Sequence, residues 1–130
     1  NLCVKGAYVL SEPDGGRDVT LISTGAEVGF AVAAAKTLAD SGVRAAVVSM
    51  PCMELFRAPS EAYRTQVLGK APRIAIEAGV AQCWYEWLRE EDEFVGLSDF
   101  GASAPAGKLF PHFGLTPDAV VATAKRLLGM

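Results

Sequence analysis

The sequence contains little histidine and little cysteine, and this scarcity narrows the chemistry that is open to it. His112 is the only histidine among 130 residues, so a metal site built from several histidines is excluded. The three cysteines, Cys3, Cys52 and Cys83, are odd in number and widely spaced, without a Cys-x-x-Cys pair. A disulfide framework is therefore not expected, and reduced thiols indicate a cytoplasmic protein.

The sequence also lacks an excess of positive charge and a long apolar run. Its formal net charge of −3 gives no reason to expect nucleic acid or an anionic membrane surface as a partner. No apolar run approaches the roughly 20 residues that a membrane helix needs. The composition is 51% hydrophobic and 21% charged, as in a folded globule, and its length fits one domain over residues 1–130. Because the chain begins at Asn1 without a methionine, we expect a fragment or processed piece of a longer chain.

The apolar pattern predicts strands that are separated by helices. The segment Ser11–Arg17 joins the first two strands through Pro13 and a Gly-Gly pair, which favour a turn. A connection this short can join antiparallel neighbours but cannot make a parallel crossover. We therefore expect a three-layer α/β/α, Rossmann-like fold whose five-stranded sheet is mostly parallel, with the first strand antiparallel. The predicted strands are Ala7–Leu10, Val19–Ile22, Val43–Ser49, Arg73–Ile76 and Phe94–Leu97.

Helix signals fall between and after these strands. From Gly25 to Ala39, apolar residues recur at three- and four-residue spacing, which predicts a helix with Glu27 in its first turn. Gly42 follows, where a glycine in the left-handed backbone conformation is expected to end this helix. Further helices are predicted from Ser60 to Leu68, over Cys83–Glu91, over Ala106–Phe113 with Pro111 shortening it, and from Thr116 onward.

Polar, glycine-rich and aromatic residues gather in the segments that follow strands. These segments are Ser23–Glu27, Met50–Phe56, Glu77–Gly79 with Trp84, and Ser98–Pro105. Parallel strands bring such segments to one edge of the sheet, where open α/β folds bind their ligands. The candidate ligand or interface residues are Ser23, Thr24, Gly25, Glu27, Glu77, Trp84, Asp99 and Ser103.

The turn at Thr24 and Gly25 has two interpretations. A strand that passes through a small-residue turn into a helix offers backbone N–H groups to an anion in many nucleotide-binding folds. Only one glycine of the usual set is present here, however, so tight packing of the helix on the sheet is the favoured interpretation.

The acids and thiols of these loops do not form a recognisable catalytic arrangement. Glu54, Glu77 and Asp99 have no spacing that sets two carboxylates in opposition, and solvated or capping roles are more common. Cys52 and Cys83 have no activating base near them in the sequence. Catalytic roles for these acids and thiols are therefore the less favoured interpretation.

Three aromatic residues stand close together in the sequence. Trp84, Tyr85 and Trp87 span too wide an arc of a helix to point in one direction. We expect at least one of them to face a neighbouring domain or subunit, since aromatic residues are enriched at interface centres. A core role and an interface role both remain open.

Several motifs share their order and spacing with a known family. They are Lys5–Leu10, Ser23–Val28, Val48–Pro51 with Glu54–Phe56, Glu77–Gly79 with Trp84-Tyr85, Asp99–Ala106, and Phe113–Thr116 with Val120-Val121. Over nearly its whole length the chain resembles the C-terminal domain of transketolase. The run Phe100–Pro105 is the most specific motif, and it separates transketolase from deoxyxylulose-phosphate synthase and the β-chains of pyruvate-type dehydrogenases, which share the fold.

The resemblance implies a complete enzyme that uses thiamine diphosphate and Mg²⁺. Such an enzyme, a homodimer, moves a two-carbon ketol unit between sugar phosphates in the pentose phosphate pathway, and the cofactor supplies the carbon–carbon chemistry. The family's diphosphate–metal motif, Gly-Asp-Gly with a later Asn, is absent here, and Asp14-Gly15-Gly16 is a surface turn. The resemblance thus implies that cofactor and sugar phosphates bind to the N-terminal and middle domains. It also implies that this chain contains no catalytic residue and is inactive alone.

Three hypotheses follow from these patterns. The first is a structural and interface domain that packs against the other domains of a transketolase. The second is a regulatory anion- or nucleotide-binding module that uses the loops around Ser23–Glu27 and Asp99–Ser103. The third is a separately encoded subunit of the same ancestry.

Overall fold

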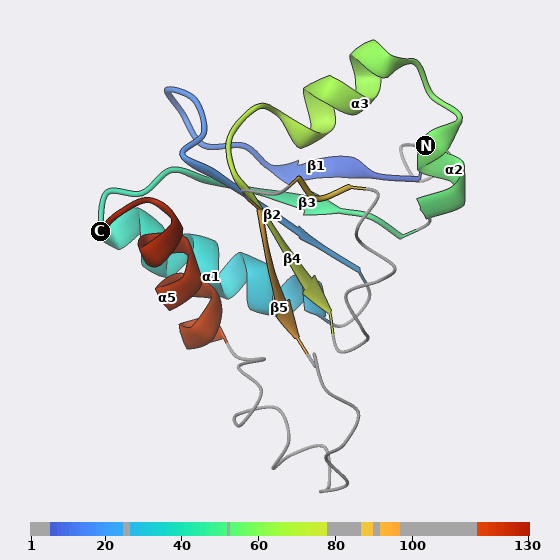
Figure 1. The fold of residues 1–130 in the computed structure, drawn as a ribbon. Helices are drawn as coiled ribbons and strands as arrows, with labels where there is room; N and C mark the ends of the chain where they lie inside the picture. Colours follow the sequence, from blue (N-terminus) through green and yellow to red (C-terminus); the bar gives the residue numbers. More distant parts are fainter. Residues whose placement is uncertain (1–5, 25–26, 52, 78–86, 90–91, 97–116) are drawn as a thin grey trace, which may run out of the picture.

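The chain folds into one mixed sheet with helices on both faces (Figure 1). A computed structural model describes residues 6–24, 27–51, 53–77, 87–89, 92–96 and 117–130. Within them the strands lie in the order β1-β3-β2-β4-β5, and only β1 runs antiparallel to its neighbour. The strands are β1 (Tyr8–Ser11), β2 (Val19–Ser23), β3 (Ala45–Ser49), β4 (Arg73–Glu77) and β5 (Glu93–Gly96).

The helices are divided between the two faces of the sheet. In Figure 1, α1 and α5 lie side by side on one face, and α3 lies with α2 on the other. Their bounds are α1 (Val28–Asp40), α2 (Met53–Arg57), α3 (Glu61–Leu68) and α5 (Pro117–Leu127).

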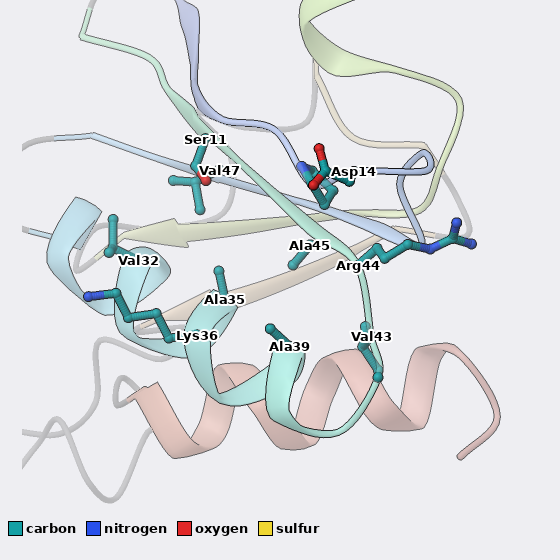
Figure 2. Close-up of a pocket in the computed structure, with 12 residues that line it drawn as sticks. Ser11, Asp14, Val32, Ala35, Lys36, Ala39, Val43, Arg44, Ala45 and Val47 are labelled. Atoms are coloured by element: carbon teal, nitrogen blue, oxygen red, sulfur yellow. The ribbon is translucent and has the colours of Figure 1, made fainter.

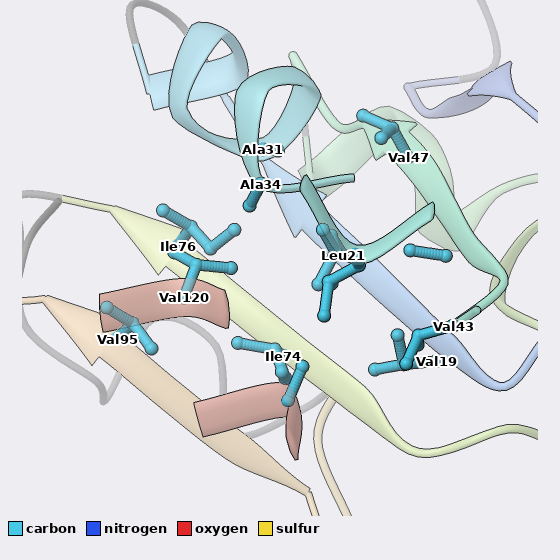
Figure 3. Close-up of a cluster of buried hydrophobic side chains, with 13 residues drawn as sticks. Val19, Leu21, Ala31, Ala34, Val43, Val47, Ile74, Ile76, Val95 and Val120 are labelled. Carbon is cyan, nitrogen blue, oxygen red and sulfur yellow. The ribbon is translucent and has the colours of Figure 1, made fainter. Parts of the chain in front are cut away.

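The core on the α1 and α5 face is built from aliphatic side chains of the central strands. Leu21, Ile74 and Ile76 project from β2 and β4 and are fully buried against α1 and α5 (Figure 3). The helix can approach closely because Ala31 and Ala34, small residues three positions apart, form its buried stripe. The central strand β2 is buried along its whole length because sheet and helix cover it on every side.

The core on the opposite face centres on an aromatic group. Phe56 of α2 is fully buried, with its ring centroid 5.0 Å from that of Trp87 and 6.3 Å from that of Tyr63. The Tyr63 hydroxyl donates a hydrogen bond of 2.8 Å to the Ala7 carbonyl, which ties α3 to the start of β1. Trp87 therefore belongs to the core.

The predicted fold class is confirmed, including the antiparallel first strand, although β1 pairs with β3 rather than with β2, to which the short turn leads. Gly42 follows α1 with a φ of +80°, a left-handed conformation that favours glycine, and Ser60 caps α3 by accepting a hydrogen bond from the Tyr63 N–H. The last helix begins at Pro117, in agreement with the start predicted at Thr116, and carries Asp118 in its first turn.

Three local predictions are wrong. Residues 53–57 form the short helix α2 rather than a loop, since five residues give too little periodicity to detect. Glu27 is the N-cap residue before α1 rather than a first-turn residue, and its side chain makes no capping hydrogen bond. The prediction failed because the spacing of apolar residues does not fix where a helix starts. Residues 87–89 are not helical, because Asp92 holds the Arg89 N–H in a tight turn. The predicted helix over 106–113 and the end of the last strand at Leu97 lie outside the described residues.

Replacing Phe56 with alanine tests the aromatic core. Phe56→Ala leaves a cavity beside Trp87 and Tyr63, so we expect a loss of about 3–5 kcal/mol in the free energy of unfolding measured with urea. The neighbouring Leu55 is 46% exposed, so Leu55→Ala is a matched control expected to cost less than about 1 kcal/mol. Equal losses in both variants would contradict this packing.

Candidate functional site

The strand ends that carry the candidate residues lie on one edge of the sheet, here called the carboxyl edge. Ser23, the last residue of β2, pairs with Ser49 at the end of β3 and with Ile76 near the end of β4. Glu77 then pairs with Gly96 at the end of β5. Parallel pairing in this register therefore aligns the four strand ends, as the sequence predicted.

The antiparallel strand β1 begins at this same edge. Its first residue, Tyr8, pairs with Ser49, and its last, Ser11, pairs with Val47 further back along β3. The backbone thus enters the sheet beside the ends of the parallel strands and leaves β1 toward the opposite edge, here called the amino edge. Anything joined ahead of Tyr8 is attached at the carboxyl edge.

The connections diverge between β2 and β4. From β2 the chain crosses through α1 to β3, on one side of β2. It then returns through α2 and α3 to β4 and continues to β5, on the other side. Neighbouring strands whose connections leave in opposite directions form the crevice where open α/β sheets bind ligands. Ser23, Thr24 and Glu77 end the two strands that flank this point.

The structure describes only part of the predicted site. It brings Ser23, Thr24 and the backbone of Glu77 to the carboxyl edge, with Glu27 at the start of α1. The other predicted residues lie outside the described residues, and they are Gly25, Trp84, Asp99 and Ser103.

Ser23 carries the most unusual polar group at this edge. Its side chain is fully buried, and among the described residues its hydroxyl has no hydrogen-bond partner. Alternation along the strand sets it on the same face as Val19 and Leu21, toward α1. The first turn of α1 has neither a side-chain cap from Glu27 nor an acidic residue. An acidic side chain or a small anion is the chemistry that complements such a helix start.

The described residues do not contain a catalytic or metal-binding cluster. Among residues 6–24, 27–51, 53–77, 87–89, 92–96 and 117–130, no group of three histidine, cysteine, aspartate or glutamate residues could hold a metal ion. In the same part of the chain, no helix is long and apolar enough to cross a membrane.

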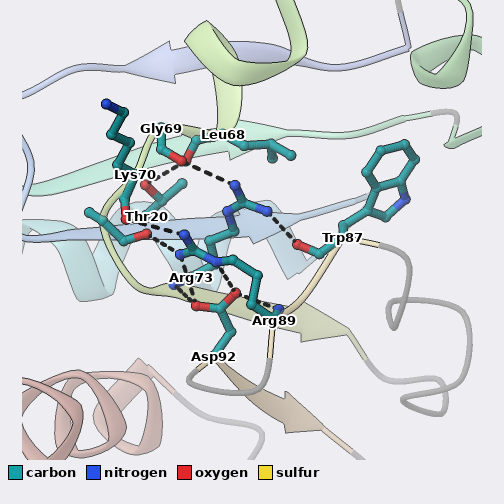
Figure 4. A network of polar contacts seen from close by, with 9 residues as sticks. Thr20, Leu68, Gly69, Lys70, Arg73, Trp87, Arg89 and Asp92 are labelled. Atoms are coloured by element: carbon teal, nitrogen blue, oxygen red, sulfur yellow. Dashed lines mark hydrogen bonds and ion pairs between the residues drawn. The ribbon is translucent and has the colours of Figure 1, made fainter. Parts of the chain in front are cut away.

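A dense polar network lies at the amino edge (Figure 4). The Asp92 carboxylate is fully buried and accepts hydrogen bonds from the Arg73 N–H at 2.8 Å and the Arg89 N–H at 2.7 Å. The Arg89 guanidinium adds contacts of 3.0 and 3.1 Å to the same carboxylate and donates to the Ala71 carbonyl at 2.7 Å. The Arg73 guanidinium donates to the carbonyls of Gly69 and Trp87.

This network is structural. Its hydrogen bonds go to backbone carbonyls and to one carboxylate, so it joins the end of α3, the start of β4 and the segment before β5. Burial alone would raise the pKa of Asp92, but the hydrogen bonds from Arg89 and Arg73 and the Arg89 charge outweigh it and lower the pKa. Sequence reasoning missed these residues, because only the spacing of Arg89 and Asp92 is local.

Comparisons with known proteins identify related chains. A family model described as "Transketolase-like TK C-terminal domain" matches residues 6–116. The chain is 56% identical to a transketolase of Sinorhizobium medicae over 98% of its length, and 53% identical to one of Cereibacter sphaeroides over 96%. The solved structure of transketolase from Leishmania mexicana superposes on 96% of this chain with a TM-score of 0.84 and 40% identity.

The relatives are much longer than this chain. The chain spans 19% of the length of each of the two bacterial transketolases and 18% of the Leishmania chain. The similarity therefore concerns one part of those proteins.

Asp92 generates a pH-dependent prediction. Because its pKa is lowered from the ordinary value of 3.8, its contribution to stability is complete well above pH 3.8 and is lost as the pH falls through the lowered pKa. We expect Asp92→Asn to reduce the free energy of unfolding by about 1–3 kcal/mol at neutral pH, since Arg89 loses its partner.

Urea unfolding of both proteins from neutral pH down to about pH 3 measures this effect. The difference between wild type and Asp92→Asn should shrink on acidification, whereas the exposed Asp40→Asn should track wild type throughout. A difference that stays constant with pH would contradict the ionised network.

Proposed function

Because the chain belongs to the transketolase C-terminal domain family, we propose that it is the C-terminal structural and interface domain of a longer ketol-transferring enzyme. The match to the family model over residues 6–116 and the identities of 53–56% to transketolases support the assignment. The fivefold greater length of those relatives supports a longer polypeptide that contains residues 1–130 as one domain.

The activity proposed for the complete enzyme is transfer of a two-carbon ketol unit between sugar phosphates, in the cytoplasm and as a homodimer. Thiamine diphosphate, held with Mg²⁺, would supply the carbanion chemistry when bound. The described residues do not fit this cofactor, because they offer no cluster of carboxylates or other donors for the metal. We therefore assign the cofactor and the sugar phosphates to the N-terminal and middle domains, and no chemical step to this chain.

The carboxyl edge is the surface proposed to dock on those domains. The observation that carries this proposal is the start of β1 at Tyr8, beside the ends of the parallel strands. A polypeptide that precedes the domain is attached at this edge, so the neighbouring domain is tethered next to it. The buried Ser23 hydroxyl and the uncapped start of α1 supply polar groups that a docked segment can satisfy.

The predicted site residues take an interface role in this proposal. Ser23 ends β2 and is followed by Thr24, Glu27 precedes α1, and Glu77 ends the neighbouring strand; we assign Gly25 to the same docking edge from its place in the sequence. We assign Trp84, Asp99 and Ser103 to the same edge on the basis of their positions after predicted strands.

A titration tests the assignment of the cofactor. We expect no heat of binding when thiamine diphosphate and Mg²⁺ are added to the isolated chain, because their site lies on other domains. The same experiment with inorganic phosphate, nucleotides and sugar phosphates should also give none. Saturable heat with the cofactor would contradict the proposal, and saturable heat with the other anions would favour the regulatory module.

A second experiment tests the docking edge. Thr24 is partly exposed at the end of β2, so Thr24→Arg should leave the Tm of the isolated chain nearly unchanged. In the complete enzyme the added side chain must fit into a filled interface, so we expect a loss of about 1–3 kcal/mol in stability, seen as a lower Tm.

Thr37→Arg provides the matched control, since Thr37 is exposed on α1 away from the carboxyl edge. It should leave both Tm values unchanged. Equal effects of the two substitutions in the complete enzyme, or no effect of Thr24→Arg, would overturn the docking edge.

A further inference from the structure

A cavity of about 460 Å³ lies between α1 and the first strands, here called the α1–β3 groove (Figure 2). The groove exists because α1 covers β3, β2 and β4, while the edge strand β1 extends beyond the helix. Its volume is in the range of roughly 300–1,000 Å³ that is typical of small-molecule sites.

The interior of the groove is apolar and is made of short side chains. On the helix side it is lined by Val32, Ala35 and Ala39, and on the sheet side by Ala45 and Val47. Alanine at three of these positions leaves space that a larger side chain would fill. A ligand that enters must therefore present an apolar body.

The outer wall is held in place by ion pairs, so the groove is formed before anything binds. The turn that carries Pro13 and Asp14 follows β1 and lines the groove. Arg44 fixes this turn by donating to the Gly15 carbonyl and by pairing with Asp18 at 3.0 Å. A wall that is already ordered lowers the entropic cost of binding a ligand.

Arg17 holds the same turn from its other side. Its guanidinium donates to both oxygens of Glu12, at 2.7 and 2.8 Å, and this hydrogen-bonded ion pair lowers the pKa of Glu12. A further bond of 2.8 Å to the Val67 carbonyl anchors Arg17 to the end of α3. The turn is thus joined to the body of the domain at two points.

The two cationic side chains that line the groove, Arg44 and Lys36, differ in position and in ion pairing. Arg44 lies at one end and is already paired with Asp18, whereas Lys36 lies at the other end beside Val32 (Figure 2). Within the described part of the chain, no carboxylate lies within ion-pair distance of the Lys36 ammonium. Its four-carbon stem extends the apolar lining, while the ammonium reaches solvent at the mouth. Asp14 lies on the turn, and its negative charge repels an anionic group there. The carboxylate of a ligand is therefore directed to the Lys36 end of the groove.

We propose that the α1–β3 groove binds a small apolar molecule with one carboxylate, whose chain lies over Ala35, Ala39 and Ala45 and whose carboxylate pairs with Lys36. The site goes beyond the proposed function and does not depend on it. It lies toward the amino edge, where β1 ends and β3 begins, and therefore away from the edge proposed to dock on other domains.

The first test is a calorimetric titration of the whole 130-residue chain with hexanoate, octanoate and decanoate, each below its micelle concentration. We expect saturable binding whose affinity rises by about two- to fourfold for each added methylene, as apolar burial predicts. Octanol and octylamine should bind more weakly than octanoate, because neither can pair with an ammonium. No saturable binding, or octylamine that binds as tightly as octanoate, would overturn the proposal.

Matched variants locate the site. Ala39→Trp fills the groove from an exposed position and should abolish octanoate binding, whereas Ala33→Trp, exposed on α1 outside the groove, should not change it. Lys36→Met should weaken binding by roughly two- to fivefold, as loss of an exposed ion pair does, and Lys125→Met on α5 should have no effect. Equal effects within either pair would overturn the assignment.

Sedimentation of the same proteins tests whether a second copy occupies the groove. We expect wild type and Ala39→Trp to have the same mass in solution. A dimer that forms in wild type and dissociates in Ala39→Trp would assign the groove to an interface between copies and would overturn the small-molecule site.

Discussion

The antiparallel pairing of β1 with β3 is the constraint on which the rest of the structure depends. It places the start of β1, paired through Tyr8 to Ser49, beside the ends of the parallel strands. The Tyr63 hydroxyl holds that start through the Ala7 carbonyl, and Arg17 anchors the turn after β1 to α3. Because the backbone enters the sheet at this edge, the proposed attachment to other domains lies beside the family motifs at the ends of β2, β3 and β4.

The two edges of the sheet differ in how their polar groups are satisfied. At the amino edge, the Asp92 carboxylate accepts hydrogen bonds from the backbone N–H groups of Arg73 and Arg89 and from the Arg89 guanidinium, all within the domain. At the carboxyl edge, the Ser23 hydroxyl has no partner among the described residues, and the first turn of α1 has no side-chain cap. A buried hydroxyl without a partner is costly, and the proposed docking would give the Ser23 hydroxyl a partner. The α1–β3 groove belongs to neither network, which makes it a separate site.

Much of the fold could be predicted from the sequence, because its main signals are local. The short Pro- and Gly-containing turn after Ser11 implied an antiparallel first strand, and Gly42 and Ser60 marked helix ends correctly. The short helix α2 was missed because its five residues are too few to show a helical period of apolar side chains. The predicted carboxyl edge was right for the described strand ends, since parallel pairing requires it.

Features that join distant residues could not be predicted. Arg17 contacts Val67, Arg44 contacts Asp18 and Arg73 contacts Asp92, and no local pattern reveals such pairs. The groove was also missed, because Ala35 and Ala39 fit the apolar pattern of a fully covered helix face. Their partial exposure results from the position of β1 at the sheet edge, which is a property of the topology.

The central claim is that the domain docks through its carboxyl edge. Hydrogen–deuterium exchange, measured on this chain alone and on the same residues within the complete enzyme, tests it most directly. The account predicts slower amide exchange in the complete enzyme around Thr24, Met50 and Glu77, with no change over Ala39–Arg44. Slower exchange over Ala39–Arg44, without any change around Thr24, Met50 and Glu77, would contradict it.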